Sequence, residues 1–226
     1  MDKYRHEIKF SINAFDKAVL SSRLSHALPR DKHAGGDGSY VVRSLYFDDC
    51  SDTAAHDKLM GVIYREKFRL RIYDGIFSVI RLEKKVKHNQ GGYKENAFLS
   101  LEECQSILSN DYQFLKQRPE MVCRQFYSRL RTGLFTPKVI VQYNREAYTW
   151  EPGHVRITLD SNVQTGLKSI DFLNGSMPLT GAFEGNVSIL EIKYNEFLPA
   201  HIGDLLLLDS RRSSALSKYI LCRRFE

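Results

Sequence analysis

Charged and apolar side chains alternate along most of the extended segments of this chain. In the segment "RHEIKF", Arg5, Glu7 and Lys9 point to one face of a strand, because successive side chains of a strand point to opposite faces. The same alternation recurs in "KFRLRIY", "IRLEKKVK", "QYNREAY", "HVRITLD" and "LEIKYN", with Lys84 as an exception in the second of these. A period of two in so many segments predicts a large antiparallel sheet.

The order of elements predicts a single α+β domain over residues 1–226. Strands are expected at 5–10, 39–49, 62–74, 77–88, 93–99, 138–150, 154–160 and 187–197. Helices are expected at 11–28, 52–61, 101–109, 112–131, 200–208 and 213–225. Asn13 is a candidate N-cap, and Ser100 with Glu103 matches a capping box. No repeat or linker divides the chain, so one domain is expected.

The composition predicts a cytoplasmic protein without a membrane segment of its own. The N-terminus carries charges where a signal peptide needs an apolar core, and no apolar run is long enough to span a bilayer. The four cysteines are widely spaced, which predicts reduced thiols and no zinc site. The formal net charge of +6 allows an anionic partner.

Two arrangements of the sheet account for the alternation. In the first, the polar face is solvated, as on an ordinary antiparallel sheet. That arrangement explains the period well and the content less well, because arginine or lysine recurs at i and i+2, and like charges on neighbouring strands repel. In the second, the sheet curls into a closed or nearly closed barrel, with polar faces lining the interior and helices covering the apolar outer faces. Such a basic interior is tolerable when a strongly anionic ligand binds there.

A basic interior with a few carboxylates is suited to a chain of phosphates. Arginine grips phosphate oxygens with two parallel hydrogen bonds, and lysine acts as a point charge. The carboxylates can hold a divalent cation that bridges phosphate oxygens. The chain has no Walker P-loop and no evident Ser-His-Asp arrangement. Its basic residues fall on predicted strands, not on one outer helix with aromatic neighbours, which argues against a nucleic-acid partner.

Eight short motifs, taken together, resemble one known family. They are "RHEIKF", "SLYFDD", "KFRLRIY", "LEKKVK", "YNREAY", "RITLD", "LEIKY" and "SKYIL", in this order along nearly the whole chain. This order resembles the VTC (vacuolar transporter chaperone) domain, the polyphosphate polymerase domain within the CYTH and triphosphate tunnel metalloenzyme group. The resemblance implies an eight-stranded antiparallel tunnel with helices packed outside. It also implies transfer of the γ-phosphoryl group of ATP onto polyphosphate.

The resemblance also implies which residues act. The residues that it implies as the clamp on the triphosphate are Arg69, Arg71, Arg145 and Lys193. Further phosphate-binding positions are Arg5, Lys9, Lys85, Lys87, Lys94, Arg156, Ser217 and Lys218. Glu191 matches the family's metal-binding glutamate, with Mn²⁺ or Mg²⁺ as the ion. Glu7 and Glu83 are either further carboxylates for that ion or partners that neutralise neighbouring arginines.

Two departures from the wider group bear on the reaction. Arg5 stands where the tunnel group often carries the first of two glutamates, so the site has lost a carboxylate and gained a cation. This change favours a polymerase over the runner-up, a hydrolase of inorganic triphosphate or polyphosphate on the same scaffold. A third reading is a module that binds polyphosphate or nucleotide without turnover. The chain resembles the stand-alone bacterial form, which implies ATP and inorganic polyphosphate or pyrophosphate as partners. A membrane-protein partner and the oligomeric state stay open.

Overall fold

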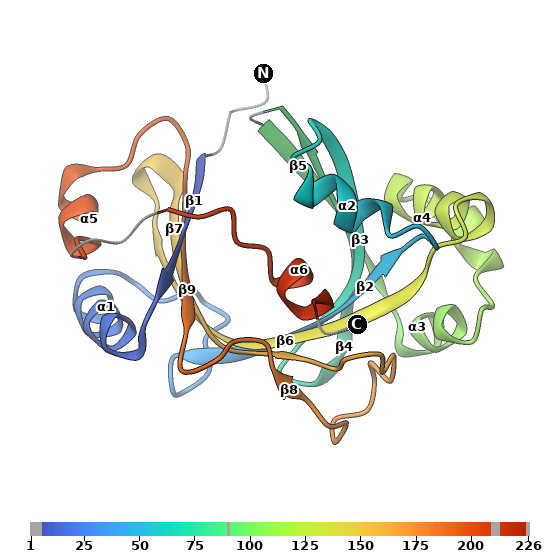
Figure 1. The fold of residues 1–226 in the computed structure, drawn as a ribbon, viewed down its shortest axis with the longest axis horizontal. Helices are drawn as coiled ribbons and strands as arrows, with labels where there is room; N and C mark the ends of the chain where they lie inside the picture. Colours follow the sequence, from blue (N-terminus) through green and yellow to red (C-terminus); the bar gives the residue numbers. More distant parts are fainter. Residues whose placement is uncertain (1–5, 90, 209–212, 225–226) are drawn as a thin grey trace.

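A strongly curved antiparallel sheet dominates the protein (Figure 1). The computed structural model describes residues 6–89, 91–208 and 213–224. The strands are β1 (His6–Ile12), β2 (Ser39–Asp48), β3 (Tyr64–Tyr73), β4 (Ile76–His88), β5 (Gly91–Leu99), β6 (Thr136–Trp150), β7 (Val155–Thr165), β8 (Thr180–Gly181) and β9 (Ser188–Tyr194). All eight segments predicted as strands are confirmed, and the two-residue β8 is additional.

The strand order is β1-β9-β7-β6-β2-β3-β4-β5, with β8 paired to β7 beside this path. The register of β2 with β6 shifts between Tyr46 and Phe47, and that of β6 with β7 shifts between Gln142 and Asn144. Such bulges bend strands and increase their twist. They lie in the long central strands, where the sheet turns around its interior (Figure 1).

The sheet is not a closed barrel. Strands β1 and β5 are its two edges, and no backbone pairing between them is present in the described part of the chain. The expectation of full closure is therefore wrong, while the nearly closed alternative agrees with the curvature. Across the opening, the ammonium of Lys85 lies 3.1 Å from a carboxylate oxygen of Glu7, so side chains bridge what the backbone leaves open.

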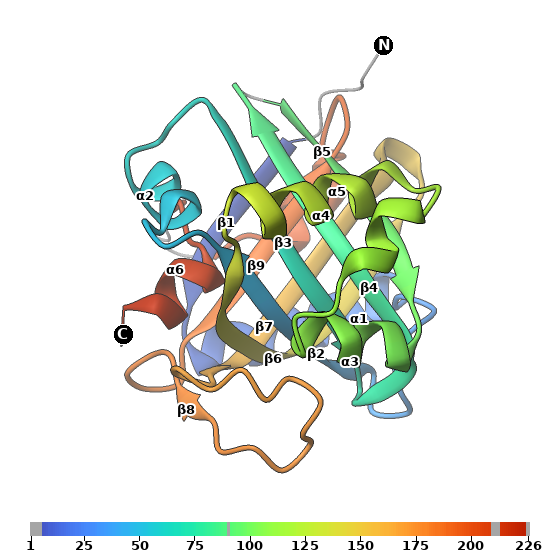
Figure 2. The same cartoon turned by 90° about the vertical axis from the view of Figure 1, so that its right-hand side faces the viewer.

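Most helices cover the outer, apolar face of the sheet. Helices α1 (Ala14–Ala27) and α5 (Ala200–Leu205) lie on one side, and α3 (Leu101–Leu108), η1 (Gln113–Gln117) and α4 (Met121–Thr132) lie on the other (Figures 1 and 2). The ring of Phe126 packs against Phe47 and Phe68 at centroid distances of 4.9 and 5.3 Å. Both predicted caps are confirmed, since Asn13 and Ser100 each form a capping box.

One short helix behaves differently, because α6 (Lys218–Arg223) packs against the inner face. The stacked rings of Tyr219 and Tyr46 have centroids 4.9 Å apart, and Tyr46 belongs to β2. The hydroxyl of Tyr219 donates to the buried Asp48 at 2.7 Å, and Asp48 also accepts from the backbone amides that begin α2 (Thr53–Leu59). The expectation that all helices lie outside is therefore wrong for α6, which Figure 1 shows within the curve of the sheet. It is also shorter than the predicted 213–225.

The helices of the described residues are short, the longest being α1 with 14 residues. Within the described ranges, none is both long and apolar enough to cross a membrane. All four cysteines are free thiols, and only Cys50 is exposed. The short η2 (Pro152–His154) completes the elements and links β6 to β7.

Candidate active site

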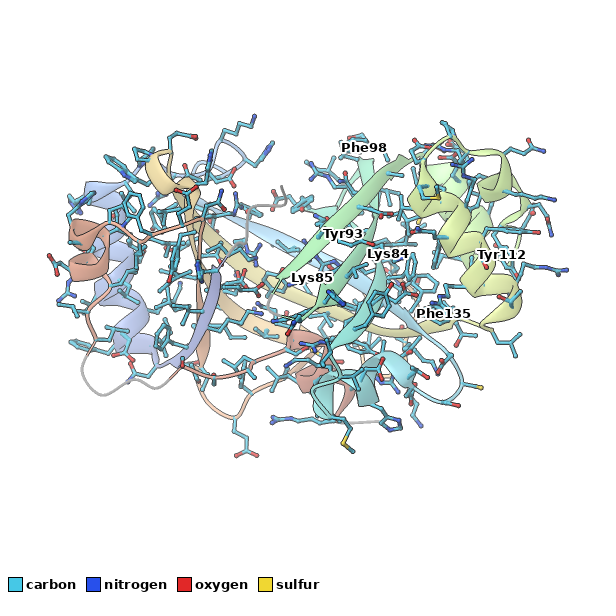
Figure 3. The ribbon with its side chains drawn as sticks, turned by 90° about the horizontal axis from the view of Figure 1, so that it is seen from above. Lys84, Lys85, Tyr93, Phe98, Tyr112 and Phe135 are labelled. Carbon is cyan, nitrogen blue, oxygen red and sulfur yellow. The ribbon has the colours of Figure 1, made fainter. Side chains whose placement is uncertain are left out.

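The predicted alternation places the charged residues on the inner face of the sheet. Backbone pairing sets Arg69 opposite Glu83 and Lys85 opposite Lys94, and paired residues share a face. Lys84, the exception in the sequence, lies on the other face of β4 from Lys85 (Figure 3). There it is buried and forms a salt bridge of 2.9 Å with Glu66, which explains how a lysine is tolerated on the helix-covered side.

Glu83 is the centre of one group of cations on the inner face. Its carboxylate accepts from Arg69 at 2.7 Å, lies 3.5 Å from a guanidinium nitrogen of Arg71 and contacts the ammonium of Lys94. Burial of this carboxyl raises its pKa, but Arg69 and Arg71 outweigh that effect, so the net pKa lies well below its usual range. Glu83 is thus a fixed anion that holds three cations together.

Neutral oxygens from β2 complete the support of the two arginines. Arg69 donates to the hydroxyl of Tyr46 at 2.8 Å, and Arg71 donates to the hydroxyl of Ser44 at 3.0 Å. These contacts fix the orientation of both guanidinium groups in a buried setting. The sequence pattern did not single out Ser44 or Tyr46, although both share the inner face with the arginines through the β2–β3 register.

A second group lies on β9 and β1. Lys9 lies 2.7 Å from Glu7 and 3.2 Å from Glu191, and Lys193 contacts Glu191 as well. Lys9 therefore bridges two carboxylates from neighbouring strands. Burial disfavours the charged form of Lys9, yet Glu191 and Glu7 more than compensate and hold its pKa above the ordinary value.

A third group joins β6, β7 and α6. Arg145 makes a two-pronged contact with the fully buried Asp160, at 2.6 and 2.7 Å. Lys218 reaches the same carboxylate at 2.5 Å, and its ammonium lies 4.7 Å from the ring centroid of Tyr143. Asp160 and Tyr143 were not among the predicted site residues, although both occupy inner-face positions of the alternating pattern.

The remaining predicted residues lie around these groups. Arg156 is held by Asp31 at 2.5 Å and by the hydroxyl of Tyr40 at 3.1 Å. Lys87 is exposed at the end of β4, where it pairs in register with Arg65. Ser217 precedes α6 at its N-cap position without a side-chain cap bond. Arg5 lies outside the described residues.

Lys67 is an inner-face lysine that the sequence prediction omitted. It precedes Arg69 by two residues on β3, pairs in register with Lys85, and its ammonium lies 4.6 Å from the ring centroid of Tyr219. No salt bridge from Lys67 to a carboxylate occurs in the described ranges, unlike the lysines of the three groups. Burial, with the charges of Lys58 and Arg65, lowers its pKa to about 7. Lys67 is the first residue of "KFRLRIY", so applying the alternation to the whole of that motif would have found it.

The carboxylates differ in how well they suit a divalent cation. Glu7 and Glu191 both approach Lys9, so their oxygens lie near one another, and each is contacted by two lysines, whereas Glu83 is contacted by three cations. Within the described residues, no group of three His, Cys, Asp or Glu residues could hold a metal ion by itself. Mg²⁺-type ions commonly use one or two carboxylates and complete their shell with substrate phosphates and water. The Glu7–Glu191 pair fits that requirement.

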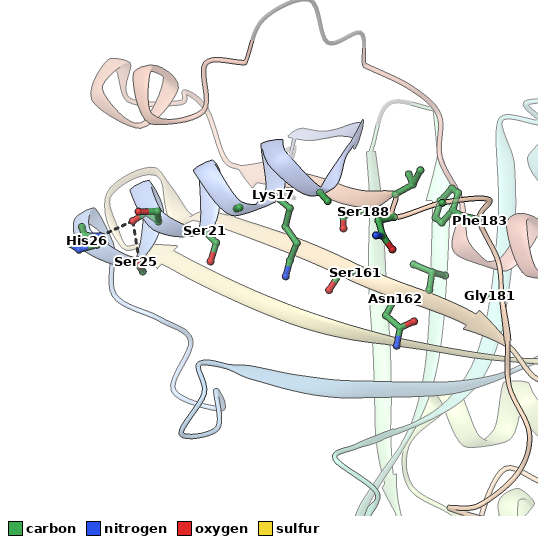
Figure 4. Close-up of a pocket in the computed structure, with 16 residues that line it drawn as sticks. Lys17, Ser21, Ser25, His26, Ser161, Asn162, Gly181, Phe183 and Ser188 are labelled. Carbon is green, nitrogen blue, oxygen red and sulfur yellow. Dashed lines mark hydrogen bonds between the residues drawn. The ribbon is translucent and has the colours of Figure 1, made fainter.

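A separate cavity of about 760 Å³ lies outside the curved sheet, between α1, β7 and the segment around β8 (Figure 4). Lys17, Ser21 and Ser25 of α1 line it, together with Ser161 and Asn162 of β7. None of the predicted phosphate-binding or metal-binding residues is among its lining residues. The candidate site is therefore the basic inner face, which the strand register defines, and not this outer cavity.

The fold and the inner face define a curved antiparallel sheet built around a basic interior, and solved structures share this fold. A putative adenylyl cyclase from Hippeastrum with a dominant triphosphatase activity aligns with 16% identity and a TM-score of 0.52, covering 89% of this chain and 84% of that one. A putative adenylate cyclase from Bacillus halodurans aligns with 14% identity and a TM-score of 0.52, covering 90% and 86%.

The family model of the VTC domain matches residues 4–225, and the chain belongs to this family. The family predicted from the ordered motifs is thus confirmed. Comparison with curated protein sequences gives no match. At identities this low, the solved structures establish the fold, and the chemistry must be argued from the site.

Proposed function

We propose that this protein is a polyphosphate polymerase that transfers the γ-phosphoryl group of ATP onto a growing inorganic polyphosphate chain. The observation that carries the proposal is the excess of cations on the inner face. Each of the carboxylates Glu83, Glu191 and Asp160 is contacted by at least two cations, and Lys67 and Lys87 add charge without such a partner in the described ranges. A polyanion supplies the missing negative charge.

The proposed reaction is a direct in-line displacement. A terminal phosphate oxygen of the acceptor chain attacks the γ-phosphorus, a new P–O–P bond forms, and the bond to the β-phosphate oxygen breaks, releasing ADP. The attacking oxygen is already anionic, so no strong general base is required. Catalysis then rests on positioning and on stabilising charge in the transition state.

The inner-face arginines are suited to this role because they are already oriented. Arg69, Arg71 and Arg145 are each held by oxygens of the protein, so little conformational freedom is lost when phosphate oxygens arrive. Lys193, Lys9, Lys85 and Lys94 extend the positive surface on both sides of the opening. We propose that Lys87, Arg156, Ser217, Lys218 and Arg5 contact more distant phosphates.

Glu191, with Glu7, is the proposed holder of Mn²⁺ or Mg²⁺. A divalent ion held by these two carboxylates would offset the negative charge of the phosphates. Glu83 remains a prediction as a further ligand, although its three cationic contacts support a role in positioning arginines. With ATP as donor, the proposed compartment is the cytoplasm, and the proposed partners are ATP, inorganic polyphosphate and pyrophosphate, without nucleic acid.

The runner-up function is hydrolysis of triphosphate or polyphosphate, with water in place of the acceptor. The Hippeastrum protein with a similar fold has a triphosphatase activity, and this observation supports the alternative. A module that binds phosphate chains without turnover is the third candidate. The retained arginines and Glu191 favour an enzyme over that module.

The test incubates the purified protein with ATP and Mn²⁺, resolves products on a polyphosphate-stained gel and assays free phosphate in parallel. Arg69→Met and Glu191→Gln should abolish polymer, whereas Arg129→Met, which alters a half-exposed arginine on the outer α4, should retain it. Polymer formation that requires Arg69 and Glu191 supports the proposal. Phosphate release without polymer overturns it in favour of the hydrolase.

A further inference from the structure

One inner-face arginine is surrounded by aromatic rings. The guanidinium carbon of Arg81 lies 5.4 Å from the ring centroid of Tyr73 and 5.3 Å from that of Phe98. Its buried Nε has no hydrogen-bond partner in the described part of the chain. Arg69, Arg71 and Arg145, by contrast, each donate their Nε hydrogen to a protein oxygen. Arg81 is thus held by aromatic rings, whereas the other three arginines are held by hydrogen bonds to protein oxygens.

This aromatic cluster, defined as Tyr73, Arg81 and Phe98, adjoins the phosphate-gripping arginines. Backbone pairing sets Arg81 between Arg71 on β3 and Phe98 on β5. Two residues along a strand span about 6.7 Å, so Arg81 lies one such step from Glu83, which holds Arg69 and Arg71. Figure 3 shows Phe98 displaced along the strands from Lys85. The cluster therefore lies beside Arg71, one step along the inner face from the Arg69–Glu83 pair.

The cluster is also accessible. Phe98 is 56% exposed, although it lies on the inner face of the sheet. It belongs to β5, an edge strand whose other inner-face residues, Lys94 and Asn96, are exposed as well. The ring of Tyr40, which is buried, lies 5.9 Å from that of Tyr73 and packs behind the cluster. An exposed aromatic ring beside an arginine is a surface on which a flat, conjugated ligand can stack.

We propose that Tyr73, Arg81 and Phe98 form a stacking platform for the base of a nucleoside triphosphate whose phosphates lie on Arg71 and Arg69. This inference deepens the proposed function, because it rests on a nucleoside triphosphate being the phosphoryl donor. Bases stack on aromatic rings and on guanidinium planes, and every base offers a flat face for this contact. The platform therefore distinguishes nucleotides from inorganic phosphate chains but discriminates little among the bases.

The test compares two ligands that share the triphosphate and differ in the base. Dissociation constants of ATP and of inorganic tripolyphosphate are measured by calorimetry for the unsubstituted protein, Phe98→Ala and Phe98→Trp. Loss of one stacking ring should weaken ATP binding by about tenfold, toward the lower end of measured base–aromatic contacts, and leave tripolyphosphate binding unchanged. Phe98→Trp should restore ATP binding. The control Phe15→Ala removes an even more exposed ring, on α1, and should change neither constant.

The outcomes separate this inference from the proposed function. Equal losses for ATP and tripolyphosphate in Phe98→Ala, or no loss for either, overturn the platform while leaving polymer formation untouched. A selective loss of ATP binding together with hydrolysis in place of polymer supports the platform and overturns the polymerase. Absence of ATP binding by the unsubstituted protein overturns both.

Discussion

Lys85 on β4 and Glu7 on β1 form a salt bridge of 3.1 Å across the opening between the two halves of the curved sheet. The pairing joins segments that share no ladder of hydrogen bonds in the described residues. Because the side chain of Lys85 is 50% exposed, water screens the contact and an incoming phosphate can compete for the lysine. The ion pair thus connects the two sides of the opening, and a polyanion that enters the interior can still displace Glu7 from Lys85.

Lys85→Met should therefore affect binding more than folding. Exposed ion pairs contribute about 0–1 kcal/mol, so the free energy of unfolding should change by less than about 1 kcal/mol. Affinity for tripolyphosphate should fall by about tenfold, as expected for loss of one charge-assisted contact. Urea unfolding and calorimetry measure the two quantities. Lys17→Met, which breaks the Lys17–Glu146 pair outside the sheet, should leave binding unchanged, and an equal loss in both variants would contradict the assignment.

Asp160→Asn should destabilise the free protein and be partly rescued by ligand. The substitution leaves Arg145 and Lys218 without their shared anion in a buried setting, and breaking a buried pair costs about 3–5 kcal/mol. Polyphosphate can supply the missing negative charge, so its addition should raise the melting temperature of the variant more than that of the unsubstituted protein. Thermal unfolding with and without polyphosphate tests this, and equal shifts would show that polyphosphate does not reach Arg145.

Binding of phosphate chains should weaken as the pH rises from 6 to 9. Burial, with the nearby charges of Lys58 and Arg65, lowers the pKa of Lys67 to about 7, and burial lowers that of Lys193 to about 8. Both lysines lose their protons within this interval, and with them their attraction for phosphate. In Lys67→Met, the fall in tripolyphosphate affinity between pH 6 and 8 should be smaller. Calorimetric titrations at several pH values measure it, and an unchanged profile would exclude Lys67 from the site.

The lowered pKa of Lys67 makes phosphate binding weaker as the pH rises, but it makes the stability of the folded state increase over the same interval. A lysine with a lowered pKa in the folded state binds fewer protons there than in the unfolded chain. Its contribution to the free energy of unfolding therefore rises with pH above the folded pKa of about 7 and levels off near the ordinary value of 10.5. Urea unfolding of Lys67→Met should show a shallower rise over this interval than the unsubstituted protein. A steeper rise in the variant would contradict this linkage.

Tyr219→Phe should show whether Tyr219 acts by holding α6 in place or through its hydroxyl group. The change removes the 2.7 Å hydrogen bond to Asp48 and the 3.1 Å hydrogen bond that the hydroxyl accepts from Arg223, while Asp48 keeps its contacts with the amides of Ala54 and Ala55. Loss of each such bond costs about 1 kcal/mol, and ring packing against Tyr46 is retained. We expect a small drop in stability with little loss of activity, whereas Tyr219→Ala should lower both by releasing Lys218 from Asp160. Activity and unfolding assays on the two variants check this, and equal activity losses would assign the hydroxyl a direct role.

Glu191→Gln should lower the affinity for Mn²⁺ in the presence of tripolyphosphate by at least about tenfold, because one of few carboxylate ligands is lost. Glu83→Gln should instead destabilise the protein, since Arg69, Arg71 and Lys94 lose their common anion. Electron paramagnetic resonance of bound Mn²⁺ measures the first effect. A larger loss of Mn²⁺ affinity in Glu83→Gln than in Glu191→Gln would contradict the assignment and identify Glu83 as the metal ligand.

The alternation of side chains was sufficient to predict the strands and to place Arg69, Arg71, Lys193 and Glu191 on a common face. A strand has a strict period of two, so the pattern fixes the face of each side chain once the segment is extended. The caps at Asn13 and Ser100 were predictable for a related reason, because their hydrogen bonds are made within a few residues. The ordered motifs added the family.

Only the tertiary structure decided which charges meet. Asp160 belongs with Arg145 and Lys218 because three distant segments converge, and no local pattern encodes that convergence. The opening between β1 and β5, the position of α6 against the inner face and the aromatic surroundings of Arg81 likewise depend on the order and curvature of the strands. Periodicity determines the face of a side chain, whereas its partner across the interior depends on how the whole sheet bends.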